Sequence, residues 1–125
     1  MNLDHTIVPS SDKEEAARFF ARVFGLTYAG PWGEFAPVVV NDTFQLDFYN
    51  MDEFGWHHYA FRVDEEEFDE IFSRIEDEGI PYGSGPSQAD NMQIGSPHQG
   101  GRTIYFHSPD RHILEIMTHR QAGVT

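Results

Sequence analysis

Hydrophobic and polar residues follow two periods along the chain, one typical of strands and one typical of helices. Alternating stretches predict strands at about 3–9, 35–41 and 43–49, and again at about 56–63, 102–107 and 112–118. After the first stretch of each set, hydrophobic residues recur at helical spacing: Ala16, Phe20, Val23 and Phe24 in one set, and Phe68, Ile71, Phe72 and Ile75 in the other. The same order of elements is therefore expected twice.

Both expected helices carry start and stop signals. Ser11 and Glu14 have the spacing of a capping box, as do Asp64 and Glu67. A glycine ends each helix, and an extended piece follows it at 26–28 in one half and at 80–82 in the other. We therefore expect an α+β fold of one domain, residues 1–125, built from two βαβββ modules, 1–50 and 51–125.

The composition narrows the class of protein. A chain of 125 residues with 39% hydrophobic and 23% charged residues has the size and composition of one globular domain. Asp and Glu number 21 against 8 Lys and Arg, a formal net charge of -13, which argues against nucleic acid as a partner. The chain has no cysteine, and its first residues resemble neither a signal peptide nor a membrane anchor. We expect a cytoplasmic protein that does not bind membranes.

Two histidines and two carboxylates occupy equivalent places in the two halves. His5 lies 20 positions before Gly25, and His58 lies 21 positions before Gly79. Asp47 and Glu115 each lie between two hydrophobic residues in the last expected strand of a half. A lone histidine on a strand is more often structural, but four such residues at repeated places indicate a shared role.

Strand alternation separates the neighbouring histidines His57 and His58. His58 shares a face with Ala60 and Arg62, whereas His57 falls on the side expected under the helix. Asp47 and Glu115 are expected on the faces turned away from the helices. His58 is therefore the histidine expected to bind a metal. His57 is expected to pack within the protein or, at most, to contact a metal ligand without binding the metal itself.

Two sheets that curve toward one another would bring the repeated residues into one cavity. Imidazole and carboxylate groups suit a divalent first-row metal, and the expected ligands are His5, Asp47, His58 and Glu115. Arg62 and Tyr49, expected on the cavity side, are candidates to orient an anionic or polar group of a substrate, although a structural role fits each equally well.

A long polar segment lengthens the second half. Residues 83–101 are rich in Gly, Pro and Ser and show no periodicity. Such a segment in a small domain is commonly a lid or a binding loop, and a disordered insertion is the alternative. His98 and Arg102, in and beside the segment, are further candidates for contact with substrate.

Three stretches together resemble the vicinal oxygen chelate superfamily, which includes glyoxalase I, fosfomycin and bleomycin resistance proteins and extradiol dioxygenases. They are LDHTIVPSSDKEEAARFFARVFGL, HYAFRVDEEEFDEIFSRIEDEGI and GGRTIYFHSPDRHILEIMT. The last is the most specific, because it resembles the superfamily's Asp-Pro-Asp-Gly-His turn and Leu-Glu ending. Ser108 replaces the first aspartate of that turn, and Arg111 replaces its glycine.

The resemblance implies paired βαβββ modules that form a cup-shaped mixed sheet around a divalent metal, with the helices outside. It implies His5, His58 and Glu115 as ligands, and a fourth falls on Asp47, where glutamate is usual. Because aspartate is one methylene shorter, Asp47 either reaches the metal through water or acts as a base. Relatives of this kind commonly form homodimers.

The leading hypothesis is a metal-dependent enzyme that chelates a small-molecule substrate through two neighbouring oxygens, with Glu115 or Asp47 as proton acceptor. Lyase or isomerase chemistry suits Ni, Zn or Mn, dioxygenase chemistry requires Fe or Mn, and the ligands permit both. The alternative is a metal-free protein that binds a drug or another small molecule in an aromatic cup, as bleomycin resistance proteins do. Fosfomycin-type transfer is less favoured, because the chain shows no cluster of basic residues.

Overall fold

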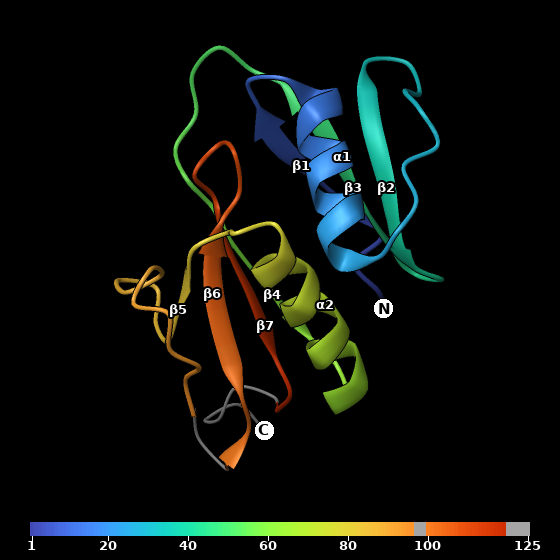
Figure 1. Ribbon diagram of the computed structural model, residues 1–125. Coiled ribbons are helices and arrows are strands. Elements are labelled where there is room, and N and C mark those ends of the chain that lie inside the picture. The colour runs from blue at the N-terminus through green and yellow to red at the C-terminus, as the bar shows by residue number, and fades with distance from the viewer. Residues whose placement is uncertain (97–99, 120–125) are drawn as a thin grey trace. The chain divides into compact units, whose positions relative to one another are not determined.

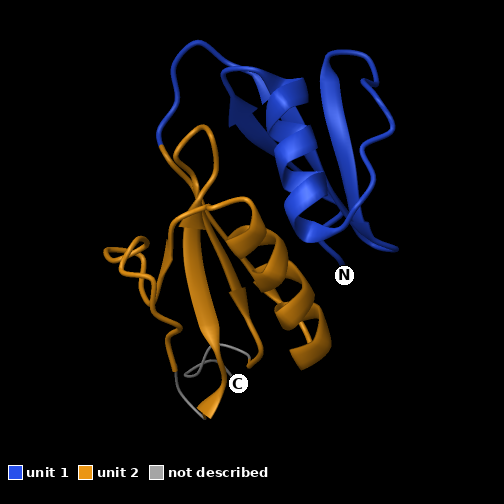
Figure 2. Ribbon diagram, in the orientation of Figure 1, with its two compact units in different colours: residues 1–55 blue, residues 56–125 orange. Residues whose placement is uncertain are grey.

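The chain divides into two compact units. The computed structural model describes residues 1–96 and 100–119. One unit comprises residues 1–55, and the other begins at residue 56 (Figure 2). The division follows Gly55, whereas the sequence predicts a module border after residue 50. Within the described residues, no helix is long and apolar enough to cross a membrane.

The first unit, all of which is described, consists of one helix packed on a three-stranded mixed sheet (Figure 1). Its elements are β1 (His5–Ser10), α1 (Lys13–Phe24), β2 (Phe35–Asn41) and β3 (Phe44–Asn50). The strands lie in the order β1-β3-β2, with β1 parallel and β2 antiparallel to β3. The strand that carries His5 therefore lies directly beside the strand that carries Asp47.

Local interactions set both ends of α1. Asp12 is the N-cap, one residue after the predicted Ser11, and its carboxylate accepts the backbone N–H groups of Glu14 and Glu15, both at 3.2 Å. Gly25 ends the helix in the left-handed conformation, with a φ of 72°. The predicted hydrophobic residues of α1 are buried, and the ring of Phe20 packs against that of Phe48 on β3, with centroids 5.9 Å apart.

The extended piece predicted at 26–28 does not join the sheet. Tyr28 packs on α1 instead: its hydroxyl donates to a carboxylate oxygen of Glu14 at 3.0 Å, and the guanidinium of Arg18 lies over its ring. The first unit therefore has the order βαββ, one strand fewer than the sequence predicts.

The second unit combines a helix with a mixed sheet that has four strands among the described residues (Figure 1). Its elements are β4 (His58–Arg62), α2 (Glu65–Asp77), β5 (Tyr82–Gly83), β6 (Thr103–His107) and β7 (Ile113–Met117). The strand order is β4-β7-β6-β5, with β4 parallel to β7 and the other neighbours antiparallel. This unit has the predicted βαβββ order, and the α+β class with mixed sheets is confirmed.

Alternate residues of the second sheet form the core beneath α2. Tyr82 of β5 lies in register with Phe106 of β6 and meets Phe72 of α2 edge-on, with ring centroids 5.0 Å apart. The Tyr82 and Phe106 side of the sheet is therefore the side that α2 covers. Residues 1% exposed or less in this unit are Phe68, Ile71, Ile75, Ile104, Phe106 and Ile116. The opposite side of the sheet carries the polar groups described below.

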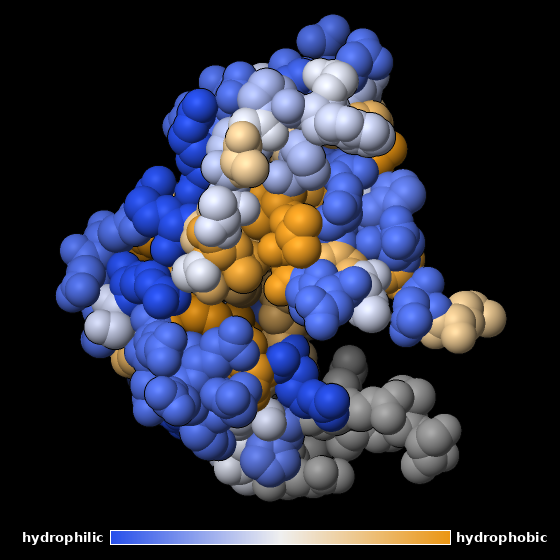
Figure 3. Space-filling view, turned by 90° about the vertical axis from the view of Figure 1, so that its right-hand side faces the viewer, coloured by the Kyte–Doolittle hydropathy of each residue, from blue (hydrophilic) through white to orange (hydrophobic). Residues whose placement is uncertain are grey.

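The surface reflects the acidic composition. Hydrophilic side chains cover most of the face shown in Figure 3, with a smaller area of hydrophobic ones. Most Asp and Glu side chains of the chain are exposed, whereas Asp47 and Glu115 are buried.

The described part of the long polar segment is hydrogen-bonded within itself and to β6. The side-chain oxygen of Asn91 accepts the backbone N–H groups of Ser84 and Gln93, at 3.1 and 3.0 Å. Gly95 and Thr103 exchange two backbone hydrogen bonds, of 2.8 and 3.0 Å. This part is not structureless, and a role as a lid stays a prediction. His98 lies outside the described residues.

The turn between β6 and β7 places an arginine in the left-handed region. Arg111, at the position where the resemblance expects glycine, has a φ of 67°. Its N–H donates to the carbonyl oxygen of Ser108 at 2.9 Å, and the Ser108 hydroxyl accepts the N–H of His112 at 3.1 Å. Both departures from the superfamily turn are therefore compatible with a closed turn, although the left-handed φ costs a residue with a β-carbon about 1–2 kcal/mol.

Replacing Arg111 with glycine should stabilise the protein. We expect Arg111→Gly to raise the free energy of unfolding by about 0.5–1 kcal/mol, because the relief of strain exceeds the added entropy of glycine in the unfolded chain. Arg111→Ala keeps the β-carbon and should change little. Urea unfolding monitored by circular dichroism measures both, and a destabilised Arg111→Gly variant would contradict the expectation.

Candidate metal centre

The side of the second sheet that faces away from α2 carries three rows of side chains. Each row takes one residue from β4, one from β7 and one from β6, in that order, and the three residues of a row are in register. The rows are His58–Ile113–His107, Ala60–Glu115–Tyr105 and Arg62–Met117–Thr103. Glu115 thus lies at the centre of this set, on the central strand. Because diagonal neighbours on adjacent strands lie within reach of long side chains, His58 and Thr103 approach Glu115 from opposite corners.

The carboxylate of Glu115 is buried and is held from both sides. Glu115 is 5% exposed, and its Oε1 lies 3.0 Å from Nε2 of His58. The Thr103 hydroxyl donates to the other oxygen, Oε2, at 2.7 Å. The His58 side chain is 37% exposed, so the pair is open to solvent on the histidine side. The structure therefore brings together two of the predicted ligands.

The spacing of these two donor atoms fits a shared metal ion. Bonds from a metal to imidazole nitrogen and carboxylate oxygen are about 2.0–2.2 Å long, so two such ligands at a right angle lie about 3 Å apart. The observed separation of Nε2 and Oε1 is 3.0 Å. A neutral nitrogen and a carboxylate oxygen suit Fe, Ni, Zn or Mn, so the residues fit the predicted divalent ion.

Tyr105 lies beside this pair and keeps its proton. It is in register with Glu115, and its ring centroid is 5.8 Å from that of His58. Burial, together with the negative charge of Glu115, raises the pKa of Tyr105 to about 12. The phenol is therefore a neutral hydrogen-bond donor across the physiological pH range.

The first unit repeats the pairing of a histidine strand with an acid strand. Ile7, two residues after His5, is in register with Asp47, as Ala60, two residues after His58, is with Glu115. Asp47 is 5% exposed and accepts a 2.8 Å hydrogen bond from the Gln45 amide. The two predicted ligands of this unit thus share a face of their sheet, at equivalent places to those of the second unit.

Two carboxylates, those of Asp4 and Asp47, influence His5. Its Nδ1 lies 2.8 Å from a carboxylate oxygen of Asp4. This hydrogen bond raises the pKa of His5 above its usual value, and the charges of Asp47 and Asp4 act in the same direction. A metal binds the neutral imidazole, so ligation by His5 requires the loss of a proton at pH values where the ring is charged.

Hydrophobic side chains are exposed beside Asp47. Ile7 and Val39 share the face of Asp47, since Ile7 is in register with Asp47 and Val39 with Gln45. Ile7 is 46% exposed and Val39 is 57% exposed. This face therefore offers apolar surface next to a carboxylate, as ligand sites for small organic molecules commonly do.

The structure collects the predicted ligands as two pairs. Among the described residues, no group of three or more His, Cys, Asp or Glu side chains has the arrangement of a metal site. His58 and Glu115 are in contact in the second unit, and His5 and Asp47 share one face of the sheet in the first. A complete set of four ligands stays a prediction.

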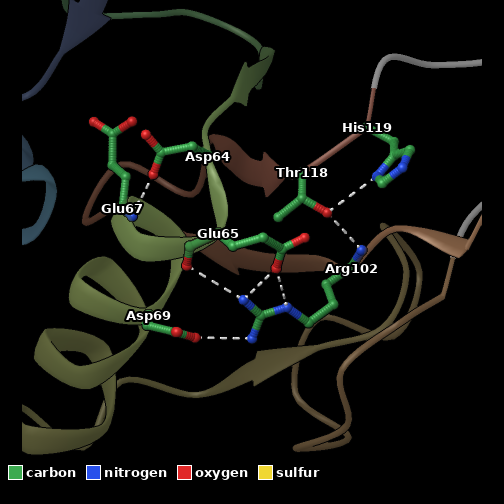
Figure 4. Close-up of polar contacts among 7 residues, drawn as sticks. All are labelled: Asp64, Glu65, Glu67, Asp69, Arg102, Thr118 and His119. Carbon is green, nitrogen blue, oxygen red and sulfur yellow. Dashed lines mark hydrogen bonds and ion pairs between the residues drawn. The ribbon is translucent and has the colours of Figure 1, made fainter.

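Arg102 lies against α2 and not on the face that carries Glu115. Its guanidinium donates to Glu65 Oε1 at 2.6 and 3.0 Å and to Asp69 Oδ1 at 2.9 Å (Figure 4). It also lies over the ring of Phe68, 4.1 Å from the centroid. These contacts attach α2 to the start of β6, and contact of Arg102 with a substrate stays a prediction.

Arg62 and Tyr49 lie on the faces predicted for them. Arg62 is exposed in the row next to that of Glu115. Tyr49 is two residues beyond Asp47 on β3, and its ring centroid lies 5.3 Å from that of Phe35. Contact of either residue with a substrate stays a prediction.

His57 lies at the entry of β4 and has a structural environment. Its backbone N–H donates to Nδ1 of the buried His112 at 2.9 Å, and its carbonyl accepts the N–H of Ile113 at 2.9 Å. Its ring stacks on that of Tyr59, with centroids 5.9 Å apart. These contacts fix the chain immediately before His58.

Thr103 and Tyr105 are site residues that sequence reasoning missed. Both belong to the face of Glu115, because the antiparallel register sets Tyr105 opposite Glu115 and Thr103 opposite Met117. The sequence feature that could have identified them is the short turn after His107, because the length of this turn sets the register of β6 against β7.

The chain is similar to known proteins over nearly its whole length, although no family model matches it. The structure of the oxidase ChaP-H2 has a TM-score of 0.92 and 37% sequence identity, covering 98% of this chain and 97% of that protein. The oxidase ChaP-H1 has a TM-score of 0.90 and 39% identity, covering 98% and 99%. A glutathione transferase, FosA from Serratia marcescens, is 26% identical in an alignment 122 positions long that covers 92% of this chain and 79% of FosA.

The paired histidine and acid strands and these similarities define one class of protein. The chain belongs to the vicinal oxygen chelate superfamily, as its sequence predicts.

The neighbouring carboxylate should control the ionisation of Tyr105. In metal-free protein, we expect Glu115→Gln to lower the Tyr105 pKa from about 12, because a negative charge is removed, while burial keeps it above its usual value near 10. NMR of the tyrosine ring carbons against pH, with Tyr105→Phe to assign the signal, measures this.

The same pKa predicts how stability depends on pH. Folding raises the pKa of Tyr105 from its usual value of 10.0 to about 12. The contribution of Tyr105 to the free energy of unfolding is therefore fully present below pH 10. It is lost as the pH rises from 10 to about 12, because in this range the tyrosine ionises in the unfolded state but not in the folded state. Wild type should lose more stability over this range than Tyr105→Phe. Titration of Tyr105 near pH 10 in wild type would contradict both expectations.

Proposed function

We propose that the protein is a metal-dependent enzyme that binds a small substrate through two neighbouring oxygen atoms. The observation that carries the proposal is the His58 and Glu115 pair, whose donor atoms lie 3.0 Å apart on one face of the sheet. A divalent ion held there supplies a Lewis acid that stabilises negative charge on substrate oxygens. His5 and Asp47 are the corresponding residues of the first unit, with His5 a ligand and Asp47 either bound to the metal through water or a base.

The surrounding side chains bind and orient the substrate in this proposal. Tyr105 donates a hydrogen bond to an anionic oxygen, because its phenol stays protonated. Arg62 provides positive charge for an anionic group at the edge of the site. Asp47, on a face that also carries exposed apolar side chains, accepts a substrate proton.

Oxidation is the reaction class that we favour. Its support is the similarity to two proteins named oxidases, at 37% and 39% identity over almost the whole chain, compared with 26% for the glutathione transferase. Oxidation requires a redox-active ion, so Fe or Mn is the favoured metal. We further propose a homodimer, with the ligand pairs of each site drawn from one chain or from two.

Metal binding should depend on His58 and not on its neighbour. We expect protein prepared without added metal to bind Fe(II) or Mn(II) in isothermal titration, and His58→Ala to weaken binding by more than about 100-fold, since even indirect partners contribute about 10–100-fold. His57→Ala is the matched control, because it removes an adjacent imidazole that packs on Tyr59, and it should bind as wild type does.

The same titration distinguishes the alternatives. Equal binding by His58→Ala, Glu115→Gln and wild type would refute the ligand assignment. A wild-type protein that binds no metal but binds aromatic compounds would instead be a metal-free binding protein.

The reaction class can be tested with the metal-loaded protein. We expect the Fe(II) form to consume dioxygen with a catechol, and Glu115→Gln to lose this activity by more than about 100-fold. Methylglyoxal hemithioacetal and fosfomycin with glutathione serve as competing substrates. Conversion of the hemithioacetal without oxygen uptake would place the enzyme among lyases and isomerases, and thiol transfer would place it with FosA.

A further inference from the structure

The two oxygens of the Glu115 carboxylate have different environments. Oε1 faces Nε2 of His58 at 3.0 Å, and Oε2 accepts the Thr103 hydroxyl at 2.7 Å. Thr103 is 3% exposed and Glu115 is 5% exposed, so the contact between them is buried. Oε2 is therefore engaged by a protein donor on the side away from His58.

The single proton of the Thr103 hydroxyl goes to Glu115. The hydroxyl oxygen also lies 3.2 Å from the Ile116 carbonyl, but the 2.7 Å distance to the carboxylate is that of a strong charge-assisted hydrogen bond. One hydroxyl donates one hydrogen bond, and the charged carboxylate is a stronger acceptor than the Ile116 carbonyl or the neutral hydroxyl of Tyr105, which is also a hydrogen-bond partner of Thr103.

The packing of Thr103 fixes the direction of its hydroxyl. Its backbone exchanges two hydrogen bonds with Gly95. A β-carbon at position 95 would lie 2.9 Å from the Thr103 methyl group, so the methyl occupies the space that the glycine leaves free. Because a threonine χ1 has few allowed values, a methyl held against Gly95 leaves the hydroxyl directed at Glu115.

We propose that Thr103 is a positioning residue: it holds Oε2 of Glu115 by a hydrogen bond, so that only Oε1, the oxygen that faces His58, binds the metal. This inference rests on the proposed function. A carboxylate that binds a metal through one oxygen occupies one coordination position, and one that binds through both oxygens occupies two. Glu115 bound through Oε1 only would therefore leave one more position for the oxygens of the substrate. Thr103 therefore preserves room for chelation of the substrate.

The test compares two substitutions that differ in the hydroxyl. Thr103→Val replaces the hydroxyl with a methyl group of similar size, and Thr103→Ser keeps the hydroxyl. Infrared difference spectra of Mn(II)-loaded protein, with Glu115→Gln to identify the band, report the separation between the two carboxylate stretches, which narrows when both oxygens bind the metal. We expect a narrower separation in Thr103→Val and a separation closer to that of wild type in Thr103→Ser, which keeps the hydroxyl but lacks the methyl group that orients it. Thr103→Ala serves in place of Thr103→Val if the latter does not fold.

An unchanged separation in the variants that lack the hydroxyl would overturn the inference. Metal affinity provides a second readout: Thr103→Val should bind Mn(II) roughly 10- to 100-fold more weakly than Thr103→Ser, and equal affinities would also count against it. If wild type binds Mn(II) through His58 and Glu115 but Thr103→Val matches it in both readouts, the role of Thr103 fails and the proposed function stands. If wild type binds no metal, the proposed function itself fails.

Discussion

A carboxylate buried in the middle of a sheet must be hydrogen-bonded or paired, and the arrangement around Glu115 follows from this requirement. Glu115 lies on the central strand β7, so its partners come from the strands on either side. His58 approaches from β4, and Thr103 and Tyr105 belong to β6. The parallel pairing of β4 with β7 and the antiparallel pairing of β6 with β7 are thus both needed to satisfy one acidic group. A shift of either register by one residue would turn the partners toward α2.

The two units share one strand arrangement around a buried carboxylate but differ in the side chains beside it. In each, the first strand pairs in parallel with the last, and the residue two after the histidine stands opposite the acid. The second unit has the small Ala60 at that position, beside the long side chain of Glu115, and the histidine reaches the carboxylate directly. The first unit has Ile7 there, beside the shorter Asp47, and the carboxylate accepts a hydrogen bond from Gln45. The repeat therefore preserves the backbone arrangement more closely than the contacts.

Periodicity and repeated motifs predicted most of the fold and the faces of the acidic strands. Both helices, the α+β class and the separation of His57 from His58 could be predicted, because each depends on local spacing. The absence of residues 26–28 from the sheet could not be predicted, because Tyr28 contacts Glu14 and Arg18 of α1 instead. A contact of this kind between a loop and a helix leaves no periodic pattern in the sequence. The contacts of Arg102 could not be predicted for a related reason: its partners Glu65 and Asp69 lie more than thirty positions away in sequence. Thr103 and Tyr105 were missed because their importance comes from register across two strands and not from their own motif.

The backbone pairing of Gly95 with Thr103 also affects how accessible the edge of the sheet at β6 is to a strand of another chain. β5 pairs with β6 only at Tyr105 and Phe106, which leaves the beginning of β6 without a neighbouring strand on that side. Gly95 pairs with this exposed backbone through two hydrogen bonds. Unpaired strand edges invite other chains to add to a sheet. The backbone at Gly95 therefore covers this part of the edge of β6, and the absence of a side chain allows it to lie this close to Thr103.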